Sequence, residues 1–543
     1  MSHPYFSVLI TFLGIFWLQS CQAPEQSIVD APNIIPAPDS MTLSGGQLAS
    51  NQTFNIVAKS EGELATAALL QEQLWLTNQV AAINTTYSAK EIEIQLQLSE
   101  EANLEKEAYE LVIDNAGIKI NASAAPGLFY GSQSLLQILS SKGDALPQLK
   151  ITDAPRFGYR GMHLDVGRHM FPVAFIKKYI DMMSHFKFNR FHWHLTEDQG
   201  WRIEIKQYPE LQNIGAFRKE TAIGYATTAT RDQVTYDGVP YGGFYTQEDV
   251  KEIVAYAQER HIMVIPEIEL PGHASAALAA YPHLGCTGGP YHTATTWGVF
   301  QDIYCVGQES TFEFLENVFD EVLPLFPGPY VHIGGDEAPK SRWENCPHAQ
   351  QRMKEEGLAN ESELQSYFVQ RIEKFLNSRG KSIIGWDEIL EGGLAPNAIV
   401  MSWRGEEGGI EAAKENHQVI MTPGEWCYFD YYQADMEAEP LAIKRITAVE
   451  KVYSYEPVPP SLSEEEQHLV LGAQCNLWSQ YITSSDHAEY MVYPRALAMS
   501  EVLWSPKGNR DYEKFVKRAS SIRPLMDAWE INYATHIFDQ KQD

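Results

Sequence analysis

The sequence is poor in cysteine, and this scarcity limits the kinds of site that it can build. Only six of its 543 residues are cysteines, and no two of them form a CxxC pair. Zinc sites made of cysteine normally use such closely spaced pairs, so we expect no zinc site. No other motif points to a bound group, and we therefore expect neither a metal nor an organic cofactor.

Positive charge is also scarce. Lysine and arginine together number 41, against 71 aspartates and glutamates, which gives a net charge of −30. Such a protein repels nucleic acids and anionic membrane surfaces and disfavours acidic substrates, so a neutral ligand fits better. The same charge also suits the solvated surface of an exported protein, and this is the explanation that we favour.

The one long apolar segment is at the N-terminus. It begins at Tyr5, is short for a membrane span, and leads to Cys21 in the sequence LQSC. This resembles a bacterial lipoprotein signal, which would make residues 1–21 a signal region with Cys21 lipidated and residues 22–31 a tether. No Lys or Arg precedes the apolar segment, so an ordinary secretory signal is the alternative. Either way we expect export, to the periplasm or the outer membrane, with the lipid as the only membrane contact.

The other cysteines are Cys286, Cys305, Cys346, Cys427 and Cys475. In an oxidising compartment Cys286 and Cys305, which bracket a loop rich in Gly, Thr and Tyr, are the natural disulfide partners. The alternative is that all five are buried thiols.

Residues 32–152 are predicted to form a small α+β domain. Residues Glu91–Leu98 alternate between apolar and polar, Tyr109–Ile120 has the pattern of a hairpin, and Gly127–Leu139 has leucines at helical spacing. The segment contains no cluster of reactive side chains, so we expect it to support the rest of the chain.

After residue 153 short apolar runs alternate with longer amphipathic ones, which is typical of repeated βα units. Residues 153–509 are therefore predicted to form a (β/α)8 TIM barrel, and residues 510–543 a last helix, Arg510–Ala534, packed on it. The segment Gly224–Gly243 is predicted to be a long loop on the active face. The predicted barrel strands are Gly161–Val166, Arg190–Leu195, Ile262–Ile268, Tyr330–Gly334, Ser382–Trp386, Ala398–Trp403, Val419–Thr422 and Leu469–Trp478. The predicted helices include Val173–Phe186, Gln247–Arg260, Thr311–Leu325, Ser362–Arg379 and Ala488–Leu503.

Nearly every predicted strand ends in a side chain that can bind or react. Each such residue alone has a structural explanation as a helix cap, a turn residue or part of the core. Their recurrence at the C-terminal ends of barrel strands instead indicates an active site. The residues are Arg168, Glu197, Asp198, His273, Asp336, Glu337, Trp386, Asp387, Glu388, Trp403, Tyr428, Asp430 and Trp478.

Carboxylates beside several tryptophans and an arginine indicate a carbohydrate site, because sugars stack their C–H faces on indoles and their hydroxyls take charged hydrogen bonds. Most glycosidases need two acids that face each other across the glycosidic bond, about 5–9 Å apart. Asp336 and Glu337 are adjacent and cannot easily do this. One is therefore predicted to protonate the leaving group while its neighbour handles a group that belongs to the substrate.

The segments that carry these residues resemble those of the β-N-acetylhexosaminidases of glycoside hydrolase family 20, in the same order, over about residues 30–510. They are RGMHLDVGRHM, FHWHLTEDQGWRIEI, IPEIELPGH, HIGGDE, GWDEI, the pair Tyr428 and Asp430, and NLWSQYI. The resemblance implies an exo-acting, retaining hydrolase that removes terminal β-linked N-acetylglucosamine or N-acetylgalactosamine from chitooligosaccharides or glycans. Two alternatives are a non-catalytic sugar-binding protein, which would have lost the acid pair, and an enzyme that releases a disaccharide or a sulfated sugar.

The resemblance also implies roles for single residues. Glu337 matches the general acid/base, and His273 matches the histidine that supports it. Asp336 matches the residue that holds the acetamido N–H of the substrate, whose own carbonyl oxygen attacks the anomeric carbon to give an oxazolinium-type intermediate. The matched substrate-binding residues are Tyr428 for the acetamido oxygen, Trp386, Trp403 and Trp478 for an apolar cage, and Arg168 and Asp430 for sugar hydroxyls.

Two positions depart from the family pattern. Relatives orient the histidine with an aspartate, where this sequence has Glu197 followed by Asp198; we expect Glu197 to take the role and Asp198 to give structural support. A relay of this kind is expected to raise the pKa of Glu337 toward neutrality. Many relatives have Glu at the position of Gln480, so we expect Arg168 to lose one compensating charge, with altered hydroxyl discrimination or weaker binding.

In that family a disulfide often closes the loop that Cys286 and Cys305 bracket here, which favours this pair over the alternative of five free thiols.

Overall fold

The computed structural model describes Met1 and residues 30–49, 53–77, 79–86, 92–99, 104–142, 145–226 and 233–539. The predicted signal region with Cys21 and most of the tether lie outside these residues. Among the helices of the described part, none combines the length and the apolarity that crossing a bilayer requires.

A small α+β domain comes first, as predicted. Its seven strands form one mixed sheet in the order β1-β7-β5-β6-β4-β2-β3. The predicted hairpin is present as β5 and β6, which pair antiparallel around a two-residue turn. Apolar side chains of both helices pack against the sheet in a core of their own. The elements are β1 Ser40–Ala49, β2 Thr53–Val57, α1 Glu61–Gln73, β3 Val80–Asn84, β4 Ile92–Leu98, β5 Tyr109–Asp114, β6 Gly117–Ala122, α2 Ala125–Lys142 and β7 Ala145–Asp153.

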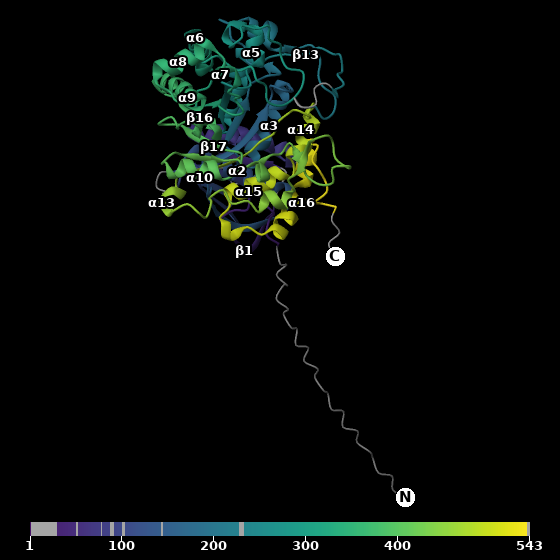
Figure 1. Cartoon of the computed structure of the whole chain (residues 1–543). Coiled ribbons are helices and arrows are strands. Elements are labelled where there is room, and N and C mark those ends of the chain that lie inside the picture. The colour runs from purple at the N-terminus through teal and green to yellow at the C-terminus, as the bar shows by residue number, and fades with distance from the viewer. Residues whose placement is uncertain are drawn as a thin grey trace.

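The second unit is a closed barrel of eight parallel strands, and all eight predicted strands are confirmed. They close in the order β14-β15-β16-β17-β18-β21-β8-β9. Figure 1 shows the helices arranged around the barrel, with α5, α6 and α8 toward one end of the molecule and β1 at the other. The strands are β8 Tyr159–Asp165, β9 Arg190–His194, β14 Met263–Leu270, β15 Tyr330–Gly334, β16 Ser382–Trp386, β17 Ile399–Ser402, β18 Val419–Met421 and β21 Val470–Cys475.

The predicted barrel helices before α16 agree with the structure except in one segment. The segment Ala488–Leu503, predicted as one helix, is divided into α14 and α15 at Tyr493-Pro494, because proline cannot continue a helix from the preceding turn. The other barrel helices predicted are all present. The bounds are α3 Val173–His185, α4 Gln247–Glu259, α5 Ser275–Ala280, α6 Glu309–Val322, α7 Ser341–Glu344, α8 Pro347–Glu356, α9 Glu361–Ser378, α10 Glu407–Lys414, α11 Gly424–Cys427, α12 Val449–Tyr453, α13 Glu464–Gln467, α14 Ser485–Val492, α15 Arg495–Trp504 and α16 Tyr512–Ala528.

The last helix, α16, ends earlier than the predicted Arg510–Ala534 and packs as expected. Its apolar residues, including Phe515 and Leu525, join the cluster that fills the space between barrel strands and helices. A second apolar cluster, which contains Trp386, Tyr428 and Trp478, lies inside the barrel. The barrel therefore has an apolar layer around it and an aromatic layer within it.

The two units share a buried ionic contact. Lys187 Nζ lies 2.9 Å from Asp153 Oδ2, and both side chains are 0% exposed. The same ammonium contacts the hydroxyl of Tyr109 at 3.0 Å and lies 4.4 Å from the ring of Trp504. Trp504 ends the barrel helix α15, yet its side chain packs in the core of the small domain. The sheet domain and the barrel are thus held together by complementary charge and by a shared core residue.

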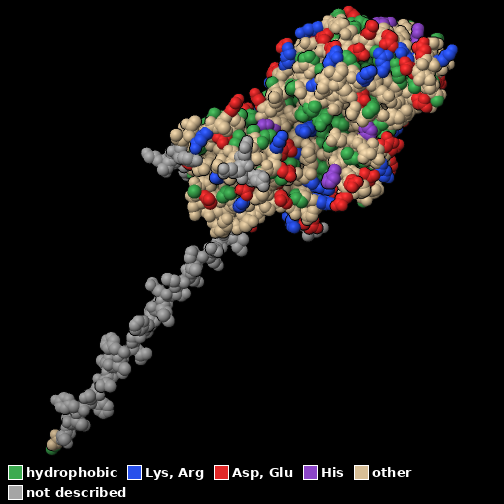
Figure 2. All heavy atoms as spheres, turned by 90° about the vertical axis from the view of Figure 1, so that its left-hand side faces the viewer, with side chains coloured by type: hydrophobic (Ala, Val, Ile, Leu, Met, Phe, Trp, Pro, Cys, Tyr) green, Lys and Arg blue, Asp and Glu red, His purple; other side chains and the backbone are tan. Residues whose placement is uncertain are grey.

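Charged side chains lie interspersed on the face of the molecule that Figure 2 shows. Acidic and basic groups are both spread over this face. This face therefore does not have the continuous basic surface that a nucleic-acid backbone requires.

Candidate active site

The predicted site residues converge because they follow the C-terminal ends of the barrel strands. They line a cavity of about 370 Å³, within the usual size of a small-molecule site. Of the twelve residues predicted for catalysis or substrate binding, ten line this cavity; Glu197 and Asp198 lie behind it. Three lining residues were not predicted. The lining is Arg168, His273, Asp336, Glu337, Trp386, Trp403, Tyr428, Asp430, Tyr431, Ile443, Arg445, Trp478 and Gln480.

Backbone geometry sets the direction of the two acids. At the end of β15 the chain passes through Gly334 and Gly335, with φ of 67° and 99°, and Glu337 itself has φ of 44°. A Cβ on Gly334 would lie 1.7 Å from a carboxylate oxygen of Glu269, so only glycine fits there. His273 also has φ of 44°. Left-handed backbone at a non-glycine residue costs about 1–3 kcal/mol, which this site bears at both of these positions.

His273 links the acid pair to two carboxylates behind it. Its Nε2 lies 3.4 Å from Glu337 and 3.6 Å from Asp336. Its Nδ1 lies 2.9 Å from Asp198, with hydrogen-bond geometry, and 3.2 Å from Glu197. Asp198 was predicted to be a supporting residue within the substrate site, but it faces away from the cavity and contacts the histidine most closely.

The two carboxylates differ because their second contacts differ. The other oxygen of Asp198 accepts the backbone N–H of Ser275, next to the His273 turn, at 2.9 Å. Glu197 instead lies 2.5 Å from the guanidinium of Arg168 and 3.3 Å from His194. The geometry therefore favours Asp198 as the residue that orients His273, and Glu197 as the counter-charge of Arg168, which corrects the expected roles.

The ionisation of the acid pair also differs from the expectation. Burial tends to raise the pKa of Glu337, but its hydrogen bond and charge interaction with His273 outweigh burial and lower it. Burial raises the pKa of Asp336. Burial disfavours the cation of His273, yet Glu197 and Asp198 hold its pKa well above the usual value. In the free site the imidazolium therefore keeps Glu337 ionised, and the predicted raised pKa of Glu337 is wrong for this state.

Arg168 does not depend on position 480 for its counter-charge. Its guanidinium lies 3.1 Å from Asp165 and 2.5 Å from Glu197, both buried. It also lies 5.1 Å above the ring of Trp478. Two carboxylates thus already compensate Arg168, and the glutamine at 480 leaves no uncompensated buried charge.

Aromatic side chains form one wall of the cavity. The rings of Trp386 and Trp478 lie 5.7 Å apart, and Trp403 and Tyr428 stack at 6.1 Å with 15° between their planes. Such a wall fits the apolar face of a sugar ring and a methyl group.

Buried acids hold two of these tryptophans. Trp386 donates its indole N–H to Glu267 at 2.9 Å, and Trp403 donates to Glu388 at 2.9 Å. Burial, with Asp336 and Asp387 nearby, raises the pKa of Glu388 to about 8. The sequence showed Glu388 in the GWDEI segment and Glu267 in IPEIELPGH, but it gave no sign that they position indoles.

Several polar atoms of the lining residues have no protein partner. They are the acceptors Asp336 Oδ1, Asp430 Oδ1 and Gln480 Oε1 and the donor Arg168 Nε. A ligand that donates N–H and O–H groups would satisfy the three acceptors. Burial raises the pKa of Asp430 to about 7. The cavity is therefore prepared for a polyhydroxylated ligand that also has an amide N–H.

Four clusters of described residues have the spacing of a metal site. Three of them lie in the barrel and use Glu197, Glu267 or their histidine neighbours. Glu197 already contacts Arg168, and Glu267 accepts the indole N–H of Trp386. The fourth cluster is made of three cysteines and lies outside the cavity.

Comparison with protein-family models gives two matches. Residues 157–507 match the catalytic domain of glycosyl hydrolase family 20, and residues 31–154 match domain 2 of the same family. Among curated proteins, the β-hexosaminidase of Porphyromonas gingivalis is 46% identical over 531 residues, which is 94% of this chain and 65% of that protein. The β-hexosaminidase of Akkermansia muciniphila is 34% identical over 81% of this chain and 87% of its own length.

Solved structures give the same answer. An exo-β-N-acetylglucosaminidase from Vibrio harveyi in complex with N-acetylglucosamine has a TM-score of 0.82 at 30% identity, covering 93% of this chain and 79% of that one. A β-N-acetylhexosaminidase from Bacteroides fragilis has a TM-score of 0.78 at 30% identity, covering 94% and 99%. The chain spans just under two thirds of the length of the P. gingivalis relative.

Proposed function

This chain belongs to glycosyl hydrolase family 20 and is thus a glycosidase, and we propose that it removes terminal β-linked N-acetylglucosamine or N-acetylgalactosamine with retention of configuration. The catalytic-domain match covers most of the barrel. The similar proteins named above are β-hexosaminidases, and one neighbour binds N-acetylglucosamine. The proposal extends these properties to the present cavity.

The observation that carries the proposal is the difference in solvent exposure between the two adjacent acids, Asp336 and Glu337. Asp336 is buried and has an unpartnered oxygen in the cavity, whereas the side chain of Glu337 is 35% exposed beside the same histidine. The more exposed acid is better placed to exchange protons with water and a leaving group. The buried acid is suited to accept the N–H of a 2-acetamido group and to hold that group in place.

In the proposed first step, Glu337 gives its proton to the glycosidic oxygen as the bond from that oxygen to C1 breaks. The acetamido carbonyl oxygen forms a bond to C1 on the opposite face, and the positive charge of the resulting oxazolinium is held beside the Asp336 carboxylate. In the second step Glu337 takes a proton from water. The water oxygen attacks C1, and the bond from C1 to the acetamido oxygen breaks, which opens the oxazolinium ring. Two inversions give net retention.

Glu337 must hold a proton when the first step begins. In the free cavity the His273 imidazolium lowers its pKa. A bound sugar would exclude water from a side chain that is 35% exposed, and loss of water raises the pKa of a carboxyl group. Substrate binding is thus the event that converts Glu337 from carboxylate to acid.

The depth of the cavity supports an exo mode of action. Arg168 and Asp430 are 6% and 4% exposed, so hydroxyls of a terminal sugar would meet buried partners and no further sugar could extend past them. A neighbouring hollow of about 490 Å³ shares Trp403, Tyr431 and Arg445 with the cavity. It offers room for the rest of a chitooligosaccharide or glycan on the leaving-group side.

The deciding experiment compares aryl β-glycosides that differ only at C2. We expect the N-acetylglucosaminide to be hydrolysed at least about 1,000-fold faster than the glucoside, because only the former contains the internal nucleophile. Proton NMR of the first product should show the β-anomer. Equal rates, or an α-anomer as first product, would exclude the substrate-assisted route.

Mass analysis of digests of chitobiose, N-glycans and GalNAc-terminated oligosaccharides would identify the natural class of substrate and detect release of a disaccharide or sulfated sugar.

Export with a lipid anchor is part of the proposal, and it rests on the apolar segment and Cys21 of the sequence. Wild type is expected in the membrane fraction of its host, and Cys21→Ala in the soluble exported fraction. An ordinary secretory signal would leave both proteins soluble.

A further inference from the structure

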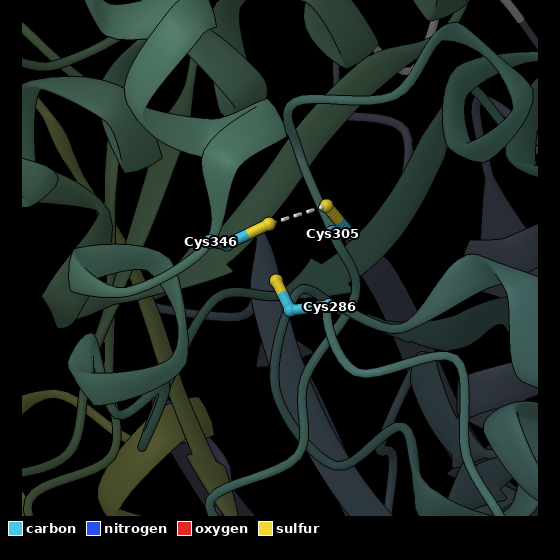
Figure 3. Close-up of side chains that lie close together, drawn as sticks. All are labelled: Cys286, Cys305 and Cys346. Atoms are coloured by element: carbon cyan, nitrogen blue, oxygen red, sulfur yellow. Dashed lines mark hydrogen bonds between the residues drawn. The ribbon is translucent and has the colours of Figure 1, made fainter.

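Three cysteines from separate segments converge outside the cavity (Figure 3). Cys286 follows the turn Pro282–Leu284, Cys305 lies in the loop before α6, and Cys346 directly precedes α8. The sulfurs of Cys305 and Cys346 lie 3.5 Å apart, and all three sulfurs lie within 4.8 Å of one another. The absence of a CxxC pair led us to expect no zinc site, but the fold brings together thiols that are distant in sequence.

Backbone contacts fix this convergence. Cys305 N–H donates to Leu284 O at 2.8 Å, next to a bridge between Gly285 and Tyr304. Trp343, in α7, donates its indole N–H to Tyr304 O at 2.9 Å, which holds the segment just before Cys346 against the same loop. A Cβ on Gly307 would lie 2.1 Å from the backbone of His348, so the two segments are in direct contact. The thiols meet because their chains are locked together.

We infer that Cys286, Cys305 and Cys346 bind one thiophilic divalent cation of the zinc class. With Zn–S bonds of about 2.3 Å, tetrahedral geometry separates two sulfurs by about 3.8 Å. The separations of 3.5 Å and up to 4.8 Å in the cluster lie on either side of that value. A disulfide would need a separation of about 2.05 Å and would leave the third thiol pressed against it.

Hydrogen-bond donors lie beside two of the sulfurs. The Gln308 side chain and the backbone N–H of Gly307 contact Cys305, and the N–H of Ala349, in the first turn of α8, contacts Cys346. Donors of this kind stabilise a metal-bound thiolate, whereas a neutral disulfide does not need them.

Burial in the cluster is uneven. Cys305 and Cys346 are buried, while Cys286 is half-buried, so solvent reaches the sulfurs from the side of Cys286. Three protein ligands leave one position of a tetrahedral ion for water or another small ligand. The proposed site is therefore an open three-cysteine site, and the ion enters beside Cys286.

A bound ion would join two parts of the active face. The segment of Cys305 also donates the N–H of Tyr304 to Pro271 O, at 3.0 Å, in the turn that carries His273. The segment of Cys346 follows the acid pair on β15. An ion on the three thiolates would cross-link these segments, so it is expected to raise the thermal stability of the chain. The catalytic side chains are not ligands, so this inference is independent of the proposed function.

The test uses the full chain, prepared with reductant and then incubated with Zn²⁺. We expect about one zinc per chain after gel filtration, with three sulfurs at about 2.3 Å in X-ray absorption spectra, and a higher Tm than for the chelator-treated protein. Cys286→Ser, Cys305→Ser and Cys346→Ser should each lower zinc affinity by more than the roughly 10–100-fold that loss of an outer-shell partner costs. Cys475→Ala removes a buried thiol elsewhere and should bind zinc as wild type does.

Three results would overturn the inference. They are zinc bound without sulfur ligands, zinc binding that survives in the triple serine variant, and a disulfide between any two of these cysteines in chain isolated without added reductant and unchanged by Zn²⁺. The last result would return Cys286 and Cys305 to their expected role as a cross-link. The X-ray absorption measurement is made on wild type, so it decides the question even if a serine variant fails to fold.

Discussion

His273 Nδ1 lies 2.9 Å from Asp198 and 3.2 Å from Glu197, so one imidazole contacts two consecutive carboxylates. Only Asp198 is bound on its other side to the turn that carries the histidine, and only Glu197 contacts Arg168. The two acids are adjacent in sequence, and both contact His273, but only Glu197 also contacts Arg168, so we propose that they have separate roles. Substitutions should separate these roles.

Asp198→Asn is expected to lower kcat by roughly 10–100-fold with little change in KM, because His273 loses the charged acceptor that orients it. Glu197→Gln should mainly raise KM, because Arg168 keeps only Asp165 as counter-charge. Steady-state kinetics on an aryl N-acetylglucosaminide measure both effects. Asp486→Asn, an exposed acid far along the chain, is the control. The opposite pattern, with kcat falling mainly in Glu197→Gln, would restore the role expected from sequence.

Glu337→Gln should lower kcat by about 100–10,000-fold, the usual contribution of a general acid. The loss should shrink for an aryl leaving group that departs without a proton. Asp336→Asn should lose a similar amount for every leaving group, because it acts on the acetamido group and not on the departing oxygen. Rates on activated and unactivated glycosides of N-acetylglucosamine measure this contrast, and identical leaving-group dependence in both variants would contradict it.

Gln480→Glu should change binding more than turnover. Arg168 already has Asp165 and Glu197 beside it, so a third carboxylate is not needed for charge balance. A stronger acceptor would bind a sugar hydroxyl more tightly, by about 1 kcal/mol or roughly fivefold in KM. The ratio of kcat/KM for N-acetylglucosaminide and N-acetylgalactosaminide should shift. An unchanged ratio would show that position 480 does not read the hydroxyl.

Asp430 should make stability fall as pH rises through neutrality. Its pKa is raised to about 7 by burial, against about 3.9 in an unfolded chain. A raised pKa contributes stability that is fully present below about pH 4 and is lost as pH rises through about 7. Asp430→Asn cannot ionise, so its Tm relative to wild type should increase between pH 5 and about 8. A constant difference would show that Asp430 is ionised throughout.

Glu267→Gln should distort the aromatic wall from behind. Glu267 accepts the indole N–H of Trp386 at 2.9 Å and lies 2.9 Å from His192 and 2.8 Å from His332. Removing one partner of a buried charge network typically costs about 3–5 kcal/mol, so Tm should fall. Affinity for the free sugar should fall as well if Trp386 moves. Thermal unfolding and inhibition by N-acetylglucosamine, measured on the same variant, distinguish loss of stability from loss of the wall.

The barrel was predictable because each of its strands is a short apolar run followed by a functional group, such as His273 after β14 or Trp386 at the end of β16. That pattern depends on local sequence and on the rule that the active site of a (β/α)8 barrel lies at the C-terminal ends of its strands. The break between α14 and α15 was missed although Pro494 signalled it, because the apolar spacing continues across the proline. The confirmed features are those that the periodicity of apolar residues and the direction of the chain are enough to predict.

Other features depend on distances that sequence does not contain. Asp198 and Glu197 are one residue apart, and only the path of the turn after β9 decides which one faces His273. Cys346 lies 41 residues from Cys305 and shares no motif with it. The lowered pKa of Glu337 depends on the summed charge of its neighbours. The sequence pattern therefore could not predict which distant residues meet in space or how their charges add up.

The ammonium of Lys187, sealed between the sheet domain and the barrel with Asp153 and Trp504, has a consequence for evolution by recombination. A gene fusion that replaced the first domain with an unrelated one would leave the ammonium group of Lys187 buried without a counter-charge, at a cost of several kcal/mol. This charge therefore favours inheritance of the two domains together. Chimeras are expected to fold when the new first domain places an acidic side chain next to Lys187.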